Sequence, residues 1–168
     1  MKNTVIKYGI YGLLTGVICF LAAILLGKSL SYSTQEVIGY VSMIASLSFV
    51  FFGIKHYRDK ENNGVISLGK AILIGLLISI LVGIGVGIAD YIYTTLINPN
   101  FASEYLNNML QTMESTLSPE EFKVKKEELI QQMENYGSPI FMACIMFITV
   151  VLIGLVISLI SGLILQKK

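Results

Sequence analysis

Asp90 is the first residue in this sequence that could do chemistry, because it is the one acidic residue in the long apolar run from Ala71 to Ile97. If that run crosses a membrane, a carboxylate inside it is expected to have a function, as a proton relay or an ion ligand. At the rise of an α-helix, Asp90 lies about 28 Å beyond Ala71, near the outer edge of a bilayer's hydrocarbon. An interfacial or bundle-capping role is the alternative, and the sequence leaves both open.

The other reactive residue types form no catalytic or metal-binding pattern. His56 is the only histidine, and the string HYRD at 56–59 is superficially similar to a kinase catalytic loop, but the other kinase motifs are missing. Cys19 and Cys144 lie outside any metal-ligand spacing, and their different depths predict two buried, unpaired thiols. No nucleophile–base pair, P-loop or dinucleotide fingerprint occurs. We therefore expect no enzyme activity, no metal and no cofactor.

The elements that hold these residues follow from composition. Of 168 residues, 54% are hydrophobic and only 14% are charged, with a net charge of +1, whereas soluble domains carry about 25% charged residues. The near-neutral balance gives no reason to expect nucleic acid as a partner. Long uncharged runs account for the low charge, and they predict that the lipid bilayer is the main partner of this chain.

Four apolar runs are each long enough to cross a bilayer, which takes about 20 helical residues. The first run, Tyr8 to Gly27, could instead be a cleaved signal peptide. It is longer than the usual apolar region of about 7–15 residues, and no small-residue cleavage site follows it. A short polar turn, Lys28 to Glu36, separates it from the second run. We expect an all-α integral membrane four-helix bundle, a single membrane domain over 1–168, with spans at about 5–27, 36–56, 68–97 and 139–165.

Residues 98–138 differ in character, and we expect an extracytoplasmic amphipathic helical hairpin there, between the third and fourth spans. Seven of the eleven acidic residues fall in this insert. Ser118, Pro119 and Glu121 form a typical capping-box start, which predicts helices at about 101–115 and 119–136. Glu121 and Lys125 have the spacing of an i,i+4 ion pair. Apolar residues at helical spacing predict packing between the helices or onto the membrane, with a ligand groove as the alternative: Phe101, Tyr105, Met109, Met113, Phe122, Leu129, Met133 and Tyr136.

Every expected span carries small residues four apart, a pattern that lets membrane helices approach closely. We predict that these residues pack helices together, within one bundle or between subunits. The third span could also bend or unwind where Gly83, Gly85 and Gly87 cluster. The residues are Gly12 and Gly16; Ser42 and Ser46; Gly75, Ser79, Gly83 and Gly87; and Gly154, Ser158 and Gly162.

The polar break from Lys55 to Lys70, with a turn signal at Asn62-Asn63-Gly64, sets the expected orientation. An even number of spans places both termini on its side, which then holds eight of the twelve Lys and Arg residues, Lys168 included. Lys28 and three lysines of the insert lie opposite. Cytoplasmic loops carry the basic excess, so we expect cytoplasmic termini. This basic loop is expected to meet lipid phosphates, with partner binding as the alternative; its residues are Lys55, His56, Arg58, Lys60 and Lys70.

Several stretches of this chain resemble one known family. They are the run GIKHYRDKENNGVISLGKA at 53–71, the INPNF break at 97–101, the acidic helical insert, a Tyr and then a Pro before the last span, and the ending LISGLILQKK. Together they resemble domain of unknown function 4199, a family of small bacterial four-span membrane proteins, over nearly the whole chain. The resemblance implies a multi-pass protein of the bacterial inner (cytoplasmic) membrane. It implies no catalytic residue and no activity.

These observations favour a non-enzymatic structural or accessory membrane subunit. Its hairpin would be a surface for a protein partner or for self-association. The alternative is a small transporter or channel-like oligomer that uses Asp90 and the glycine-rich third span. An inverted repeat would favour that alternative, and the sequence shows no convincing internal similarity.

Overall fold

The computed structural model describes residues 1–27, 30 and 32–167, and these residues are almost entirely helical. Within them there is no β-strand, which confirms the all-α fold class. Lys28 and Lys168, which entered the expected charge bias, lie outside the described residues. The elements are α1 (Lys2–Gly27), α2 (Tyr32–His56), the π-helix η1 (Tyr57–Glu61), α3 (Leu68–Ile92), the π-helix η2 (Tyr93–Ile97), α4 (Phe101–Thr116), α5 (Pro119–Tyr136) and α6 (Pro139–Leu165).

Four helices are long and apolar enough to cross a membrane, as the four runs predict. Their apolar segments are compatible with a membrane protein and cover Lys2–Ala23, Thr34–Glu61, Leu68–Ile97 and Pro139–Leu165. The expected polar turn at 28–36 is too long, because α2 already begins at Tyr32. Ser, Thr and Gln are compatible with a first helical turn, where backbone N–H groups lack helical partners. The glycine cluster does not unwind α3, which stays α-helical to Ile92.

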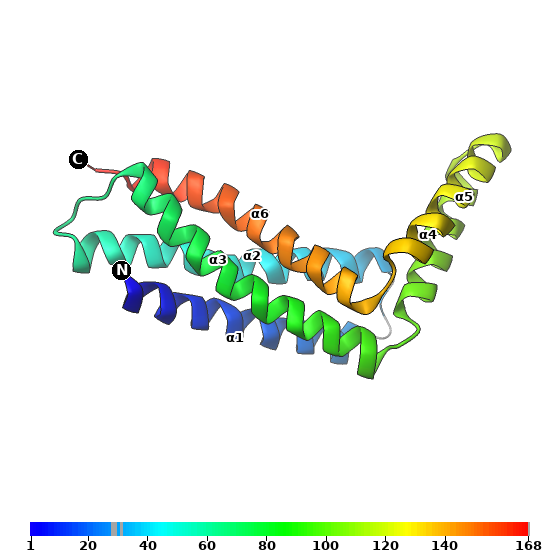
Figure 1. Cartoon of the computed structure of the whole chain (residues 1–168), viewed down its shortest axis with the longest axis horizontal. Coiled ribbons are helices and arrows are strands. Elements are labelled where there is room, and N and C mark those ends of the chain that lie inside the picture. The colour runs from blue at the N-terminus through cyan, green and yellow to red at the C-terminus, as the bar shows by residue number, and fades with distance from the viewer. Residues whose placement is uncertain (28–29, 31, 168) are drawn as a thin grey trace. The chain divides into compact units, whose positions relative to one another are not determined.

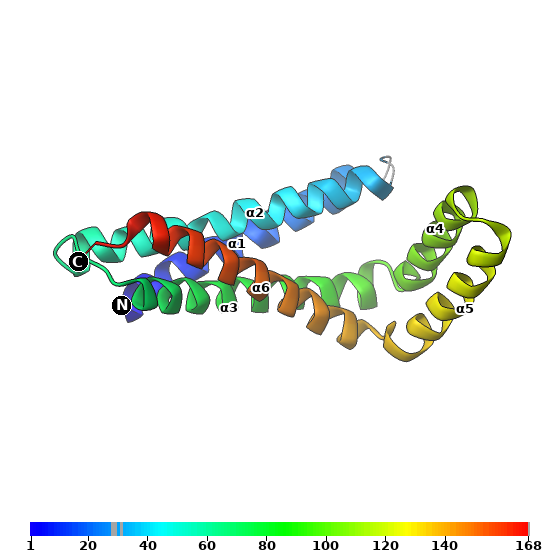
Figure 2. The same ribbon diagram turned by 90° about the horizontal axis from the view of Figure 1, so that it is seen from above.

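The described residues divide into two compact units, and the first comprises Met1–Ala89 with Met146–Lys168. Here α1, α2 and the adjoining parts of α3 and α6 run alongside one another (Figures 1 and 2). The core residues of α3 recur every four positions, at Ile74, Ile78 and Val82, and all are fully buried. Large apolar residues also cover the outside, such as Ile18 and Val41, each about three-fifths exposed. A helix that is apolar all round suits a membrane.

The second unit, Asp90–Ile145, holds the end of α3, η2, α4, α5 and the start of α6. The capping box at the start of α5 is confirmed, since the Ser118 side chain accepts from the Glu121 N–H and the Glu121 carboxylate accepts from the Ser118 N–H. At the other end, the Gly137 N–H donates to the Met133 carbonyl at 2.8 Å. A Cβ on residue 137 would lie 2.4 Å from that same oxygen, which explains the glycine.

Candidate functional site

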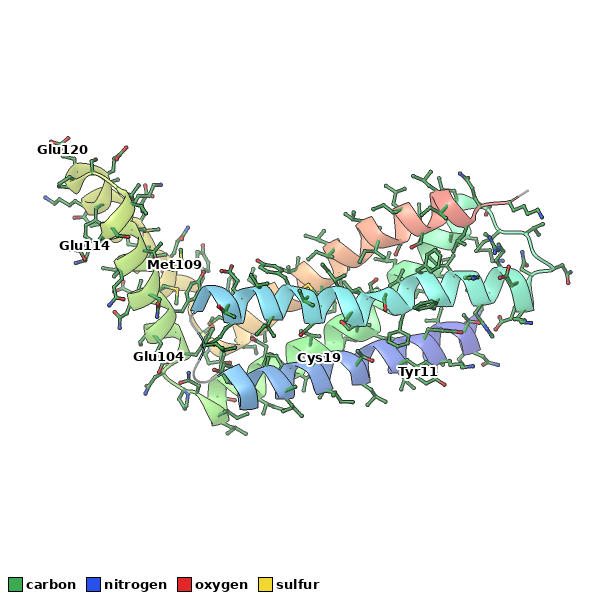
Figure 3. All side chains as sticks on the ribbon, turned by 180° about the vertical axis from the view of Figure 1, so that it is seen from behind. Tyr11, Cys19, Glu104, Met109, Glu114 and Glu120 are labelled. Atoms are coloured by element: carbon green, nitrogen blue, oxygen red, sulfur yellow. The ribbon has the colours of Figure 1, made fainter. Side chains whose placement is uncertain are left out.

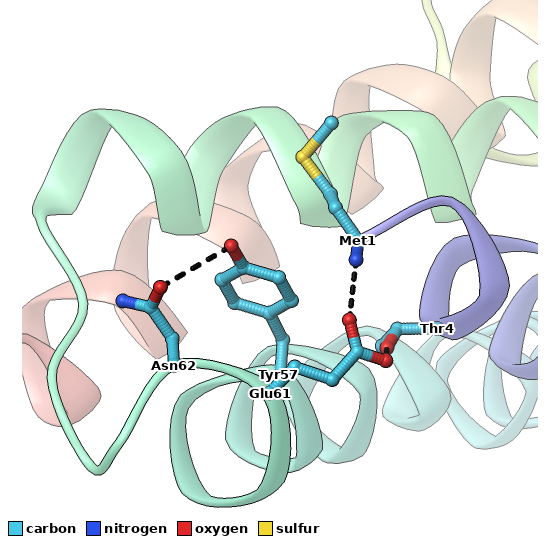
Figure 4. A network of polar contacts seen from close by, with 5 residues as sticks. All are labelled: Met1, Thr4, Tyr57, Glu61 and Asn62. Carbon is cyan, nitrogen blue, oxygen red and sulfur yellow. Dashed lines mark hydrogen bonds and ion pairs between the residues drawn. The ribbon is translucent and has the colours of Figure 1, made fainter.

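Glu61 joins the end of η1 to the start of α1 in the first unit. Its carboxylate accepts a hydrogen bond from the Thr4 hydroxyl and pairs with the Met1 amino group (Figure 4). Thr4 is 1% exposed, so this contact fixes a buried side chain. The sequence does not reveal the pair, because Thr4 and Glu61 are separated by two apolar helices.

The loop after η1 turns through Asn63 and Gly64, which have φ values of 52° and 82°. Asn and Gly tolerate this left-handed conformation best, so the turn signal in the sequence is confirmed. The Asn62 side chain closes the turn by donating to the Val65 carbonyl at 2.7 Å. Figure 4 also shows the Tyr57 hydroxyl directed at Asn62.

The end of α6 is tied to the same loop. Ile66 and Lys167 exchange two backbone hydrogen bonds, of 2.9 and 3.0 Å, as a short antiparallel bridge. Nη1 of Arg58 donates to the carbonyl of Leu165 at 3.3 Å. The start of α1, the 57–67 segment and the end of α6 therefore form one cluster at one end of the first unit, which we call the terminal cluster (Figure 1).

The predicted basic residues divide between this cluster and the surface. Lys55 and Lys60 are exposed. Arg58 binds Asp59, with 2.6 Å between Nε and Oδ1. The His56 ring lies against Tyr8 with ring centroids 5.4 Å apart, and Lys70 lies 5.5 Å above the Tyr57 ring. Three of the five, His56, Arg58 and Lys70, thus make contacts inside the protein.

The predicted small residues of α3 and α6 meet as reciprocal pairs. A Cβ on Gly154 would lie 2.1 Å from Oγ of Ser79, and one on Gly75 would lie 2.2 Å from Oγ of Ser158. Each serine donates its hydroxyl to the glycine carbonyl one turn earlier in its own helix, Ser79 to Gly75 at 2.8 Å and Ser158 to Gly154 at 2.6 Å. We call these four residues the glycine–serine seam. Both hydroxyls are satisfied without a partner across the seam.

The remaining predicted small residues pack in different places. Gly83 faces Phe147 and Gly162 faces Leu68, while Gly12 and Gly16 of α1 approach Ser46 of α2. Ser42 is half-buried, Gly87 is buried, and the two cysteines are free, Cys19 half-buried and Cys144 exposed. The expectation of two buried thiols is therefore wrong for Cys144, which lies on an outward face of α6. Three further close contacts, at Gly9, Gly53 and Gly85, were not identified by the pattern of small residues four positions apart.

Asp90 lies on the buried side of α3 and is 7% exposed. Thr94, one turn further on, is 4% exposed, and its hydroxyl donates to the Asp90 carbonyl at 2.9 Å. The helix then changes to the π-helical η2, in which the Asn98 N–H reaches back to the Tyr93 carbonyl. Single π turns are frequent at functional sites. Thr94 was not predicted, although its spacing of four from Asp90 could have identified it.

The pair of α4 and α5, which pack against each other, leaves much of its apolar surface incompletely covered. No residue of α4 is buried, and Leu129 is the only buried residue of α5. Met109, Met113, Phe122 and Met133 are half-buried. Glu104, Glu114 and Glu120 lie along the outer surface of this pair (Figure 3).

The charges of α5 pair differently from the spacing in the sequence. The expected Glu121–Lys125 pair does not form: Nζ of Lys125 lies 2.8 Å from Oε2 of Glu128 instead. Glu121 is occupied by the capping box, and the hydrogen bonds from the Ser118 side chain and backbone hold its pKa below its usual range. The bond to Glu128 raises the pKa of Lys125. Across the described part of the chain, no three His, Cys, Asp or Glu side chains gather as a metal site.

Comparison with known proteins gives one match. The model of the family described as "Protein of unknown function (DUF4199)" matches residues 7–167. That is the family which the 53–71 run resembles. No curated protein and no solved structure matches the chain.

Proposed function

This chain belongs to the DUF4199 family of proteins of unknown function, and we propose that it is an integral membrane protein with a structural or accessory role and no enzyme activity. In this proposal the α4–α5 pair is the surface that binds a protein partner or a second copy. The protein resides in the bacterial inner membrane, with its termini and the 55–70 loop in the cytoplasm. The α4–α5 pair then lies outside the cytoplasm.

The incomplete burial of the α4–α5 pair is the observation that carries the proposal. A helix pair in water is stabilised by burying an apolar face, yet α4 has no buried residue. Met109, Met113, Phe122 and Met133 remain half-exposed, and only Leu129 of α5 is buried. Methionine adapts well to irregular partner surfaces. A partner that covers this face would remove apolar area from water at about 25 cal/mol per Å².

The terminal cluster supports the orientation. It brings the start of α1, the 57–67 segment and the end of α6 together, and these carry Lys2, Lys7, Lys60 and Lys167. One end of the first unit is therefore basic. Basic ends of membrane helices favour the cytoplasmic side.

Site-specific photo-crosslinking in native membranes tests the partner surface. A photoreactive residue at Met113, which is half-buried, should give a discrete crosslinked protein band. The matched control is Thr112, its exposed neighbour on the same helix. Crosslinking at Met113 only to lipid, or equal crosslinking at both positions, would contradict a protein partner on this face.

A second candidate function is a small transporter or channel-like oligomer. The burial of Asp90 and Thr94 on one side of α3 favours it. Reconstitution of the chain in liposomes, followed by measurement of ion flux, tests this candidate. Flux that equals that of protein-free liposomes would exclude it.

A further inference from the structure

The end of α3 holds an acidic residue whose side chain is largely buried and makes no hydrogen bond or ion pair within the described part of the chain. Asp90 is only 7% exposed. Among the described residues, no hydrogen bond or ion pair reaches its carboxylate; the ion pairs found there are Met1–Glu61, Arg58–Asp59 and Lys125–Glu128. No fully buried side-chain oxygen in the described residues lacks a partner, so the Asp90 carboxylate keeps some access to its surroundings. A largely buried carboxylate is nevertheless costly to leave charged, and proteins pair it or neutralise it.

Thr94 does not supply the missing donor. A threonine hydroxyl has one hydrogen to donate and two lone pairs to accept with. The hydrogen of Thr94 is directed at backbone carbonyls, those of Asp90 at 2.9 Å and Tyr91 at 3.3 Å. Its oxygen is therefore available only as an acceptor or a metal ligand. Asp90 and Thr94 stand one turn apart on the same buried side of the helix.

Exposed apolar residues place this pair within the depth of the bilayer rather than at its edge. The helix continues beyond Asp90 through Ile92, Leu96 and Ile97, which are 43%, 77% and 49% exposed. Such side chains suit lipid rather than water, and they occupy about 10 Å of helix after Asp90. The approximate depth from sequence did not distinguish an interfacial from an intramembrane Asp90, whereas these residues favour the intramembrane position.

We propose that Asp90 and Thr94 form a binding site for a monovalent cation, H⁺ or Na⁺. A proton converts the carboxylate to an acid whose O–H can donate to the Thr94 oxygen. A sodium ion takes carboxylate and hydroxyl oxygens together as ligands. A divalent metal fits poorly, because no cluster of acidic or histidine ligands occurs in the described residues. Tyr91 of α3 and Tyr93 of η2 are the nearest titratable neighbours in the sequence.

This site rests on the membrane insertion proposed above, but it does not depend on the α4–α5 surface or on transport. The test uses the full-length chain in liposomes and dicyclohexylcarbodiimide, which attaches to carboxylic acids in apolar surroundings. Mass spectrometry then measures the labelling rate of the peptide that contains Asp90. One series varies pH in choline chloride, and a second replaces choline with Na⁺ at constant pH.

We expect Asp90 to be labelled, with a rate that falls about tenfold per pH unit once the carboxyl group ionises. Slowing by pH alone identifies a proton site, and additional slowing by Na⁺ identifies a sodium site. No adduct on Asp90, or a rate that neither pH nor Na⁺ changes, would overturn the proposal. Asp90→Asn must abolish the adduct, and Glu120→Gln, at an exposed acid, must leave it unchanged.

Thr94 has its own readout. Thr94→Val keeps the shape but removes the oxygen, so the pH midpoint of labelling should fall by about one unit, or protection by Na⁺ should be lost. Thr94→Ser should behave as the wild type. If Thr94→Val changes neither property, the two-residue site is wrong. Failure of crosslinking at Met113 would leave these results untouched, whereas extraction of the protein from membranes by alkaline carbonate would contradict both proposals.

Discussion

Ser79 of α3 occupies the space that a side chain on Gly154 of α6 would need. A Cβ on Gly154 would lie 2.1 Å from Oγ and 2.4 Å from Cβ of Ser79. The same relationship recurs one turn away with the roles exchanged, between Ser158 of α6 and Gly75 of α3. In the proposed membrane setting, lipid gives little drive for helix association, so this close approach is what would hold α3 and α6 together in the seam.

The seam predicts that serine and glycine can change places. Gly154→Ser alone should destabilise the protein by about 1–3 kcal/mol, because the added side chain overlaps Ser79. Ser79→Gly combined with Gly154→Ser should recover most of that loss. Unfolding in mixed detergent micelles compares the single and the double variant with the wild type. Gly69→Ser is the control, since nothing lies within 4 Å of a Cβ there. Equal loss in the single and double variants would contradict the reciprocal packing.

The capping box predicts a pH dependence for α5. Bonds from Ser118 hold the pKa of Glu121 low in the folded state, so the ionised cap adds stability above the unfolded pKa of about 4.3. That contribution is lost as pH falls through the lowered folded value. Ser118→Ala should cost about 1 kcal/mol of helix stability. It should also move the pKa of Glu121 up toward its ordinary range, because the side-chain bond is lost and the bond from the residue 118 N–H remains. Carbon-13 NMR of labelled glutamates in nanodiscs measures this pKa, and an unchanged value in Ser118→Ala would contradict the cap.

The bond from Thr4 to Glu61 predicts local protection of the start of α1. Thr4→Val keeps the buried shape but removes the donor, which should cost about 1 kcal/mol because Glu61 keeps access to water. Amide hydrogens at the start of α1 should then exchange about fivefold faster by mass spectrometry. Asp59→Asn is the control, since Asp59 pairs with Arg58 and not with Thr4. Equal acceleration in both variants would mean that the loop, and not Thr4, sets the protection.

The proposed orientation predicts opposite accessibility for two exposed positions. In a variant with Cys19 and Cys144 replaced by serine, Ser115→Cys should react with a membrane-impermeant thiol reagent in spheroplasts. Lys60→Cys should react only after permeabilisation. Both native positions are exposed, so burial does not decide the result. The reverse pattern would place the termini outside the cytoplasm.

Periodicity and charge predict the helical elements of this chain well, because the four apolar runs and the Ser118-Pro119 start depend on residues close in sequence. Contacts between distant segments are different. The spacing of Gly75 and Ser79 indicates that this face of α3 packs against another helix. It does not identify Ser158 and Gly154 of α6 as the residues against which it packs. That choice depends on how two helices are rotated about their axes.

Polar pairing was harder to predict, even locally. Lys125 has Glu121 four residues before it and Glu128 three residues after it, and either spacing allows a pair. The capping box decides the outcome, because it occupies Glu121 and leaves Glu128 for Lys125. The burial of Asp90 was likewise not predictable from sequence spacing. The place of Asp90 in the run is visible in the sequence, but its burial beside Thr94 depends on the face of α3 that the fold covers.

The bridge between Ile66 and Lys167 has a consequence for the order of assembly during synthesis. Ribosomes make Ile66 long before Lys167, so in the proposed topology the loop stays in the cytoplasm and α3 enters the membrane before this partner exists. The terminal cluster can close only after Lys167 has left the ribosome, which in the proposed topology follows the insertion of α6. Closure of this end is therefore a late step, and a block in the insertion of α6 would leave an earlier, open intermediate for quality-control proteases to recognise.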